Sequence, residues 1–282
     1  MVEPQVPTVR VQSGPKLFRA TQAALRALVL GPQPTQEVLT TAIFSDPALA
    51  CQFMKFANMP GRRPQDGFRS IKDAVAWLGL IPLQAFMRRL CERSAFEDVA
   101  GFGAEMQHHS LATALVARFL ADVKSDPEAE TVELFALVHD IGIQLCIQDL
   151  GVDYRELEPT PADHRRLHLS ERRVLGFDHA KIGWHALSVW GVPEPLPTLV
   201  AWHHQGSRAY SVGGVIGRAV AYLRAAEDLV NLLGSLKTPD VRDLRPFMHT
   251  EPARQLGLKA DSLLESWPRL VSRVEGLSAS FG

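Results

Sequence analysis

The chain has 282 residues, of which 46% are hydrophobic and 22% are charged, and its formal net charge is −1. This composition is typical of a folded globular protein that can bury a substantial core. The near-neutral charge provides no overall field to attract DNA, RNA or an anionic membrane. Nucleic-acid binding and membrane binding are therefore disfavoured.

The cysteines and the N-terminal residues indicate in which cellular compartment the protein is expected. Cys51, Cys91 and Cys146 form an odd set without CxxC spacing, and each lies in an apolar stretch, which is typical of reduced, buried thiols. Residues 1–16 contain no apolar segment of a secretory signal, and no apolar run approaches the roughly 18 residues of a membrane span. We expect a soluble, cytoplasmic protein with a flexible N-terminus over residues 1–13.

The first part of the chain shows apolar residues at helical spacing, interrupted by proline and glycine. Gly31-Pro32 ends one such segment, and Ser45-Asp46-Pro47 provides an N-cap followed by proline in the first turn of another. Nothing alternates with period two. The pattern predicts a bundle of about five short helices, over residues 17–30, 35–44, 48–57, 70–78 and 82–91.

A second block of helices begins near Ala104. Its most apolar segment, residues 130–148, is hydrophobic nearly all round and predicts one central, buried helix. Further helices are expected over residues 168–175, 179–190, 195–202, 215–233 and 260–277. The fold class is therefore all-α, with an N-terminal helical subdomain over residues 14–103, a second helical subdomain over residues 104–234 and a C-terminal helical extension over residues 235–282.

A histidine and an aspartate, His139-Asp140, interrupt the most apolar predicted helix. Burying both costs several kcal/mol unless they are paired or bind a cation. Neighbouring helical residues point about 100° apart and can reach one ion, with His109 of an adjacent helix as a third ligand. Such ligands suit iron, manganese, zinc or nickel, and the ion could activate water for attack on a phosphoester. From the spacing alone, a metal-free polar network in which Asp140 pairs with His109, His139 or an arginine is the favoured explanation, because a lone HD pair is a weak signal.

Several short segments together resemble the HDOD family, a bacterial signalling output domain related to the HD-type metal phosphohydrolases. The resemblance covers residues 14–231 and rests on the order and spacing of Asp46-Pro47-Ala48-Leu49-Ala50, Phe56-Ala57-Asn58, Ala74-Val75-Ala76-Trp77-Leu78-Gly79, His109-Ser110-Leu111-Ala112, Leu137-Val138-His139-Asp140-Ile141-Gly142, Gly176-Phe177, His179, Gly183, and Trp202-His203-His204. Each segment alone is a weak signal, but their combined order is specific.

The resemblance implies a set of metal ligands. In HD hydrolases a histidine, the HD pair and a distal aspartate bind one ion, and two-metal relatives add further histidines; the matching residues here are His109, His139, Asp140, His179, His203 and His204. The distal aspartate aligns with Tyr222, whose neutral phenol is a poor ligand at pH 7. Gln205-Gly206-Ser207 stands where cyclic-dinucleotide phosphodiesterases have Gly-Tyr-Pro, so hydrolysis of cyclic-di-GMP is not expected.

Two functions therefore stand against each other. One is a non-catalytic regulatory domain that binds a signalling protein partner or a small ligand, with no cofactor or with a structural ion. The alternative is a metal-dependent phosphohydrolase acting on a nucleotide or another phosphoester, in which Asp140 is the catalytic residue. The role of Glu171 has two explanations: it either orients His179 or is an exposed helix carboxylate. Gly183 is expected to allow close helix packing.

Overall fold

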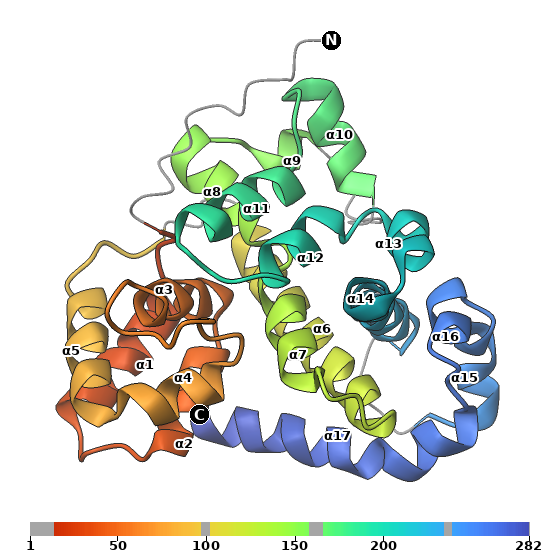
Figure 1. Ribbon diagram of the computed structural model, residues 1–282, viewed down its shortest axis with the longest axis horizontal. Helices are drawn as coiled ribbons and strands as arrows, with labels where there is room; N and C mark the ends of the chain where they lie inside the picture. The colour runs from red at the N-terminus through yellow and green to blue at the C-terminus, as the bar shows by residue number, and fades with distance from the viewer. Residues whose placement is uncertain (1–13, 97–101, 158–165, 234–238, 282) are drawn as a thin grey trace.

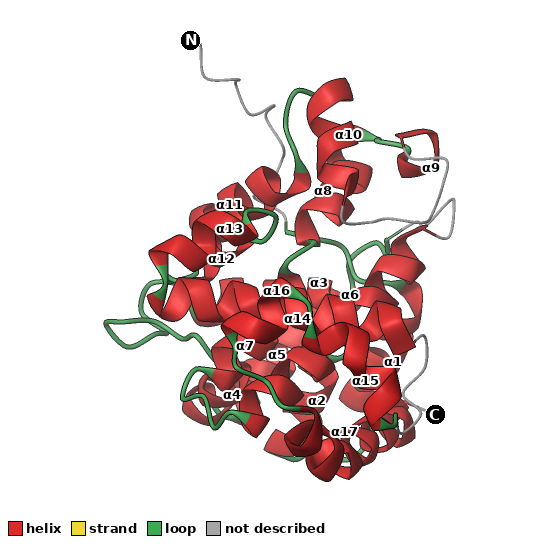
Figure 2. Ribbon diagram, turned by 90° about the vertical axis from the view of Figure 1, so that its right-hand side faces the viewer, coloured by secondary structure: helices red, strands yellow, loops and turns green. Residues whose placement is uncertain are grey.

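The computed structural model describes residues 14–96, 102–157, 166–233 and 239–281. These residues form seventeen helices and, within those ranges, no strand (Figures 1 and 2). The all-α prediction is confirmed. The expected flexible N-terminus, residues 1–13, lies outside the described residues.

The N-terminal helices follow the predicted order closely. They are α1 (Arg19–Leu30), α2 (Gln36–Phe44), α3 (Pro47–Ala57), α4 (Ile71–Leu78) and α5 (Leu80–Cys91). The side chain of Asp46 caps α3 by accepting from the backbone N–H groups of Ala48 and Leu49, as the sequence predicted. Helix α5 starts two residues earlier than expected, because Gly79 alone, at φ 73°, makes the break from α4.

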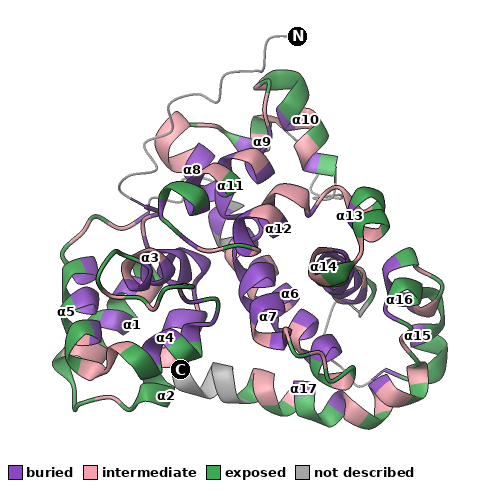
Figure 3. Cartoon of the chain, viewed as in Figure 1, coloured by how far each residue is buried: buried purple, intermediate pink, exposed green. Residues whose placement is uncertain are grey.

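The second group of helices surrounds the centre of the molecule. It comprises α6 (Phe102–Val123), α7 (Ala129–Val138), α8 (Ile141–Leu150), α9 (Tyr154–Leu157), α10 (Leu167–Val174), α11 (His179–Val189), α12 (Leu196–Trp202), α13 (Gly206–Val212) and α14 (Gly214–Leu233). Helices α6, α7 and α14 pack against one another. Every residue of α7 except Glu130 is buried, as its apolar sequence predicted (Figure 3).

The single helix predicted over residues 130–148 is wrong, because the chain breaks at the HD pair. His139 ends α7, and Asp140, with φ −98° and ψ 12°, precedes α8. The backbone N–H of Ile143 bonds to the carbonyl of Asp140 at 2.9 Å, a tight turn rather than a continuous helix. Apolar periodicity carries no sign of this break, since both flanking segments are buried.

Two glycines allow α8 and α11 to approach closely. A Cβ on Gly142 would lie 1.9 Å from the carbonyl oxygen of His179 and 3.0 Å from the backbone nitrogen of Gly183. A Cβ on Gly183 would lie 2.8 Å from a methyl group of Val200. The expectation for Gly183 is therefore confirmed, and this contact sets His179, the first residue of α11, beside the HD turn.

The C-terminal helices are α15 (Val241–Met248), α16 (Glu251–Gln255) and α17 (Ala260–Phe281). Helix α17 runs along α6 and reaches α2 of the N-terminal bundle (Figure 1). Its buried Trp267 meets Phe119 of α6 edge to face, with ring centroids 5.6 Å apart. Arg273 of α17 pairs with Glu133 of α7, which also pairs with Arg118 of α6 at 3.0 Å. None of the described helices is long and apolar enough to span a membrane.

Candidate metal centre

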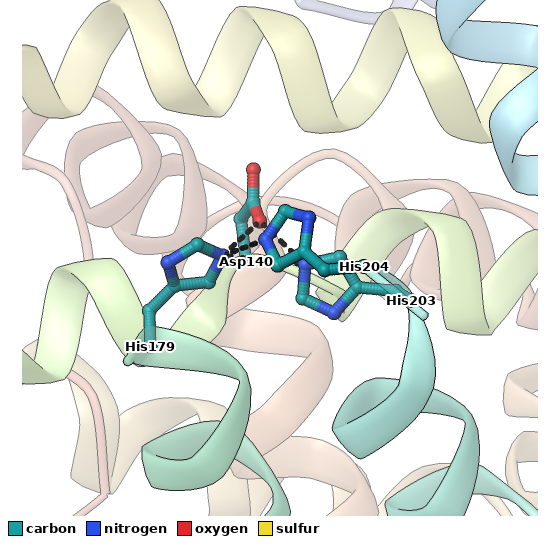
Figure 4. A group of neighbouring side chains, drawn as sticks. All are labelled: Asp140, His179, His203 and His204. Carbon is teal, nitrogen blue, oxygen red and sulfur yellow. Dashed lines mark hydrogen bonds and ion pairs between the residues drawn. The ribbon is translucent and has the colours of Figure 1, made fainter. Parts of the chain in front are cut away.

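The six residues that the sequence singled out come together in one buried place. Asp140, His179, His203 and His204 offer ligand atoms that all lie within 4.8 Å of one another (Figure 4), and we call them the first ligand group. His109 and His139 form a second ligand group of the same compactness with Glu227. The ligands come from α6, the turn between α7 and α8, the start of α11, the end of α12 and α14.

Asp140 connects the two ligand groups. Its Oδ2 atom lies 3.0 Å from His139 Nε2 and 3.9 Å from His109 Nε2. Its Oδ1 atom lies 3.1 Å from His179 Nε2 and 3.4 Å from His203 Nε2. Each carboxylate oxygen thus faces a different ligand group, which the HD turn makes possible by directing one side chain between α6, α11 and α12.

The carboxylate expected from α14 is supplied by a different residue from the one the alignment indicated. Tyr222 points away, and its hydroxyl donates to Asp126 at 3.2 Å. Glu227 lies five residues further, about 140° around the helix, and its Oε1 atom is 3.8 Å from His139 Nε2. Helix α14 therefore does bring a carboxylate to the centre. It belongs to Glu227, whose side chain is one methylene longer than that of an aspartate and which stands at a different position from Tyr222.

Sequence reasoning missed Glu227, although one signal was available. Val220, Leu223, Glu227 and Val230 follow a three-and-four spacing, so the glutamate interrupts an apolar stripe. A charged residue on a buried stripe needs partners just as the HD pair does. His168 of α10 was missed as well: its ring stacks on that of His204, with centroids 4.0 Å apart, and no spacing in the sequence connects the two.

Hydrogen bonds at Nδ1 fix the ring orientation of three histidines. Nδ1 of His139 lies 2.8 Å from the carbonyl oxygen of Ala136, and Nδ1 of His203 lies 2.7 Å from that of Val200. Nδ1 of His179 lies 2.6 Å from the carboxylate of Glu171. An oxygen at Nδ1 requires that nitrogen to carry the proton, so each neutral ring presents the lone pair of Nε2 to the centre.

The converging atoms are therefore mainly hydrogen-bond acceptors. His179 Nε2 lies 3.2 Å from His203 Nε2 and 2.8 Å from His204 Nε2, and all three surround the Asp140 carboxylate. Two lone pairs at such distances repel unless a ring N–H or a positive charge lies between them. The charge can come from protons on some of the rings or from a metal ion, and imidazole nitrogen with carboxylate oxygen is a donor set that suits divalent transition metals.

The pKa values in the centre reflect the competition between burial and the carboxylates. Burial would lower the pKa of His179, but the charges of Glu171 and Asp140 outweigh it and raise this pKa well above its usual value. Burial likewise opposes the raised pKa of His139, to which Asp140 contributes most. Burial and the charge of His179 lower the pKa of His203 to about 4, although Asp140 opposes this. Without a metal, the protons therefore belong mainly on His139 and His179.

Most of the centre is buried, whereas His109 and His204 are partly exposed. His139, His179 and His203 are at most 1% exposed, and Asp140 and Glu227 are 9% and 4% exposed. The cavity beside Asp140 has a volume of about 20 Å³ and is lined mainly by apolar side chains. That volume accommodates about one water molecule, whereas pockets for small molecules have roughly 300–1,000 Å³.

Several proteins of known structure have a similar fold. The chain resembles the response regulator MmoQ from Methylococcus capsulatus str. Bath, with 24% identity, 91% of this chain and 96% of that chain covered, and a TM-score of 0.66. A virulence factor (cj0248) from Campylobacter jejuni subsp. jejuni has 17% identity, 94% coverage of both chains and a TM-score of 0.68. A phosphohydrolase candidate from Shewanella amazonensis SB2B has 19% identity, coverage of 96% and 95%, and a TM-score of 0.52.

These structural similarities show the fold alone, and no curated protein matches the chain in sequence. The family is shown by the sequence itself, since the HDOD domain profile matches residues 16–206, more than half of the chain. That match includes α1 to α12 and every proposed ligand except Glu227. The chain belongs to the HDOD family.

Proposed function

We propose that this protein is a non-catalytic signalling domain whose buried centre binds a divalent transition metal ion. The observation that carries the proposal is the convergence of imidazole Nε2 atoms and carboxylates in a largely buried site, at distances that suit a shared cation. A role in signalling is consistent with the structural resemblance to a response regulator. The output would be the binding of a protein partner or a small ligand.

The residues present fit such an ion. Asp140, His179, His203 and His204 would hold one ion, and the second ligand group could hold another with Asp140 shared between them. When bound, the ion would neutralise the buried carboxylates and act as a Lewis acid towards a phosphoester that reached it. The chain's own part is to keep the Nε2 lone pairs directed inwards and to exclude water.

The burial of the site favours binding over turnover. A phosphoester substrate must bring its phosphorus and an attacking water to the same place, and the cavity on the α6 and α8 side of Asp140, which no histidine of the centre lines, holds about one water molecule. With five of the seven ligand residues at most 9% exposed, the ion would be a structural element of the domain. In this arrangement Asp140 is a ligand and has no substrate to act on.

A second candidate function is a metal-dependent phosphohydrolase that acts on a nucleotide or another phosphoester. One observation favours it: Glu227 restores the carboxylate that Tyr222 lacks, so both ligand groups contain an acidic residue and at least two histidines. For this activity the region around Asp140 would have to open far enough to admit a substrate.

The test combines metal content with activity. Protein purified without a histidine tag should contain metal by mass spectrometry and should not hydrolyse model phosphoesters or cyclic dinucleotides with added manganese, iron or nickel. Glu227→Gln should weaken metal binding roughly tenfold or more, because a neutral amide replaces a charged donor, whereas Tyr222→Phe should not. Protein that neither contains nor binds metal would refute the metal-binding proposal. Robust turnover, abolished by a chelator and by His139→Ala, would establish the phosphohydrolase instead.

A further inference from the structure

Glu171 of α10 is a carboxylate with no exposed surface and with both oxygens in use. Its Oε2 atom accepts from the backbone N–H of His179 at 3.0 Å and from Nδ1 of the same residue at 2.6 Å. Its Oε1 atom accepts from the hydroxyl of Tyr154 at 2.6 Å. The sequence left open whether Glu171 orients His179 or faces solvent. In the structure Glu171 is buried and contacts His179.

The position of His179 in its helix explains why a side chain is needed there. His139 and His203 each direct Nδ1 to the carbonyl three residues earlier, which α7 and α12 supply. His179 is the first residue of α11, so the residue three positions earlier, Gly176, lies outside that helix. A helical carbonyl is therefore not in place behind the ring, and Glu171 from another helix provides the acceptor.

Tyr154 of α9 in turn holds the carboxylate. Its side chain is buried, at 2% exposure, and its hydroxyl donates to the oxygen that does not face His179. This hydrogen bond prevents the carboxylate from rotating. The contacts run in one line from Tyr154 through Glu171 to His179 and on to Asp140, which lies 3.1 Å from His179 Nε2.

We propose that Glu171 and Tyr154 are positioning residues that fix the tautomer and the direction of His179 and thereby set the cation affinity of the first ligand group. Neither residue is a ligand, because both lie on the Nδ1 side of the ring, away from the ion. The inference rests on the proposed metal-binding function. It assigns to α9 and α10 a defined task in the centre.

The matched variants are Glu171→Gln and Tyr154→Phe, with Tyr222→Phe as the control. Glutamine is neutral and has one oxygen instead of two. If that oxygen keeps the His179 contacts, the amide N–H₂ faces the Tyr154 hydroxyl, which must then accept instead of donate, and the negative charge behind the His179 ring is lost. Tyr222→Phe also removes a buried hydroxyl that donates to a carboxylate, that of Asp126, but this pair lies apart from the histidines. It reproduces the chemical change without the connection to His179.

Divalent cobalt is a suitable probe, because its visible absorption reports on the geometry of its ligands. Glu171→Gln should weaken cobalt binding about 10–100-fold, and Tyr154→Phe by a smaller factor, and both should alter the spectrum of the bound ion. The control should keep the affinity and the spectrum of the unmodified protein. Nitrogen-15 NMR of the metal-free protein should show the Nδ1–H signal of His179 shifted in Tyr154→Phe, because its hydrogen bond to Glu171 is no longer held in place.

The outcomes separate the two proposals. If the unmodified protein does not bind cobalt, the proposed function and this inference both fail. If it binds cobalt while Glu171→Gln and Tyr154→Phe keep its affinity and spectrum, the positioning role alone is overturned. If Glu171→Gln does not fold, Tyr154→Phe decides: an affinity and a His179 ring signal equal to those of the Tyr222→Phe control would overturn the inference.

Discussion

At the scale of single residues, the centre resolves a problem that the sequence poses. A histidine and an aspartate in the most apolar part of the chain require partners, and these partners come from four other places in the fold: α6, α11, the end of α12 and α14. Asp140 faces both ligand groups, so its charge is compensated from two sides. The same residues that make the buried aspartate tolerable are those that can bind an ion.

Protonation of His139 and His179 should make metal binding depend on pH. Their pKa values are raised mainly by the nearby carboxylates, against the effect of burial. A raised histidine pKa contributes stability that is present below the ordinary value of 6.5 and is lost as the pH rises through the raised value. A metal ion must displace these protons, so it competes best at higher pH.

The melting temperatures of metal-loaded and chelated protein should therefore move apart as the pH rises from about 6 to about 8. The chelated protein loses the contribution of its protonated histidines over that range, and the loaded protein does not. Thermal melts in matched buffers provide the measurement. A difference that stays constant or narrows towards pH 8 would show that these histidines do not hold the protons in the metal-free state.

At the residue scale, short motifs in the sequence predicted which histidines lie together with Asp140. His109, His139, Asp140, His179, His203 and His204 were named, and the fold brings them together. Glu227 was not named, because the choice between Tyr222 and Glu227 depends on which face of α14 meets the centre. That orientation is set by tertiary packing and not by local spacing.

At the scale of helices, caps and breaks at proline or glycine were predictable and a break at a polar pair was not. The starts of α3 and α4 follow from Asp46 and Ser70, whose side chains accept from the first free backbone N–H groups. The division of α7 from α8 at His139-Asp140 has no proline and depends on contacts with helices distant in sequence. Local propensity contains no information about such contacts.

The contact between α8 and α11 provides a prediction at this scale. Gly142→Ala should lower the free energy of unfolding by about 3 kcal/mol or more, because the new methyl group meets the backbone carbonyl of His179, which cannot move without shifting α11. Gly183→Ala should cost less, about 1–2 kcal/mol, since it meets only a methyl group of Val200. Denaturation by urea measures both.

The two glycine variants control for each other, because alanine favours the helix over glycine by about 1 kcal/mol in both. Equal losses of stability would mean that α8 and α11 do not approach at Gly142 as closely as described. Gly142→Ala should also reduce metal affinity, since it displaces the residue that begins α11.

At the scale of the whole molecule, the C-terminal helix joins parts that are far apart in sequence. Helix α17 lies outside the residues matched by the HDOD profile, yet it packs along α6 and reaches α2. The ion pairs of Arg273 and Arg118 with Glu133 connect it to α7 and α6. We therefore expect the extension to be an integral part of the folded unit.

Trp267→Ala tests this expectation. Its indole is completely buried against α6, so removing it should cost about 3–5 kcal/mol in the free energy of unfolding. Trp77→Ala is the matched control, because that side chain is 64% exposed on α4 and its loss should cost roughly 1 kcal/mol or less. If both variants unfold at the same urea concentration, α17 is not packed as described.

The wide spacing of the proposed ligands along the chain has a consequence for folding. Asp140, His179 and His203 of the first ligand group are separated by tens of residues, so an ion held by that group would tie together distant segments of the chain. A metal cross-link of this kind removes conformational entropy from the unfolded chain, and its effect grows with the length of the loops that it closes. Five short neighbouring helices, α8 to α12, lie within those loops, and one bound cation would restrain them all as a cross-link does.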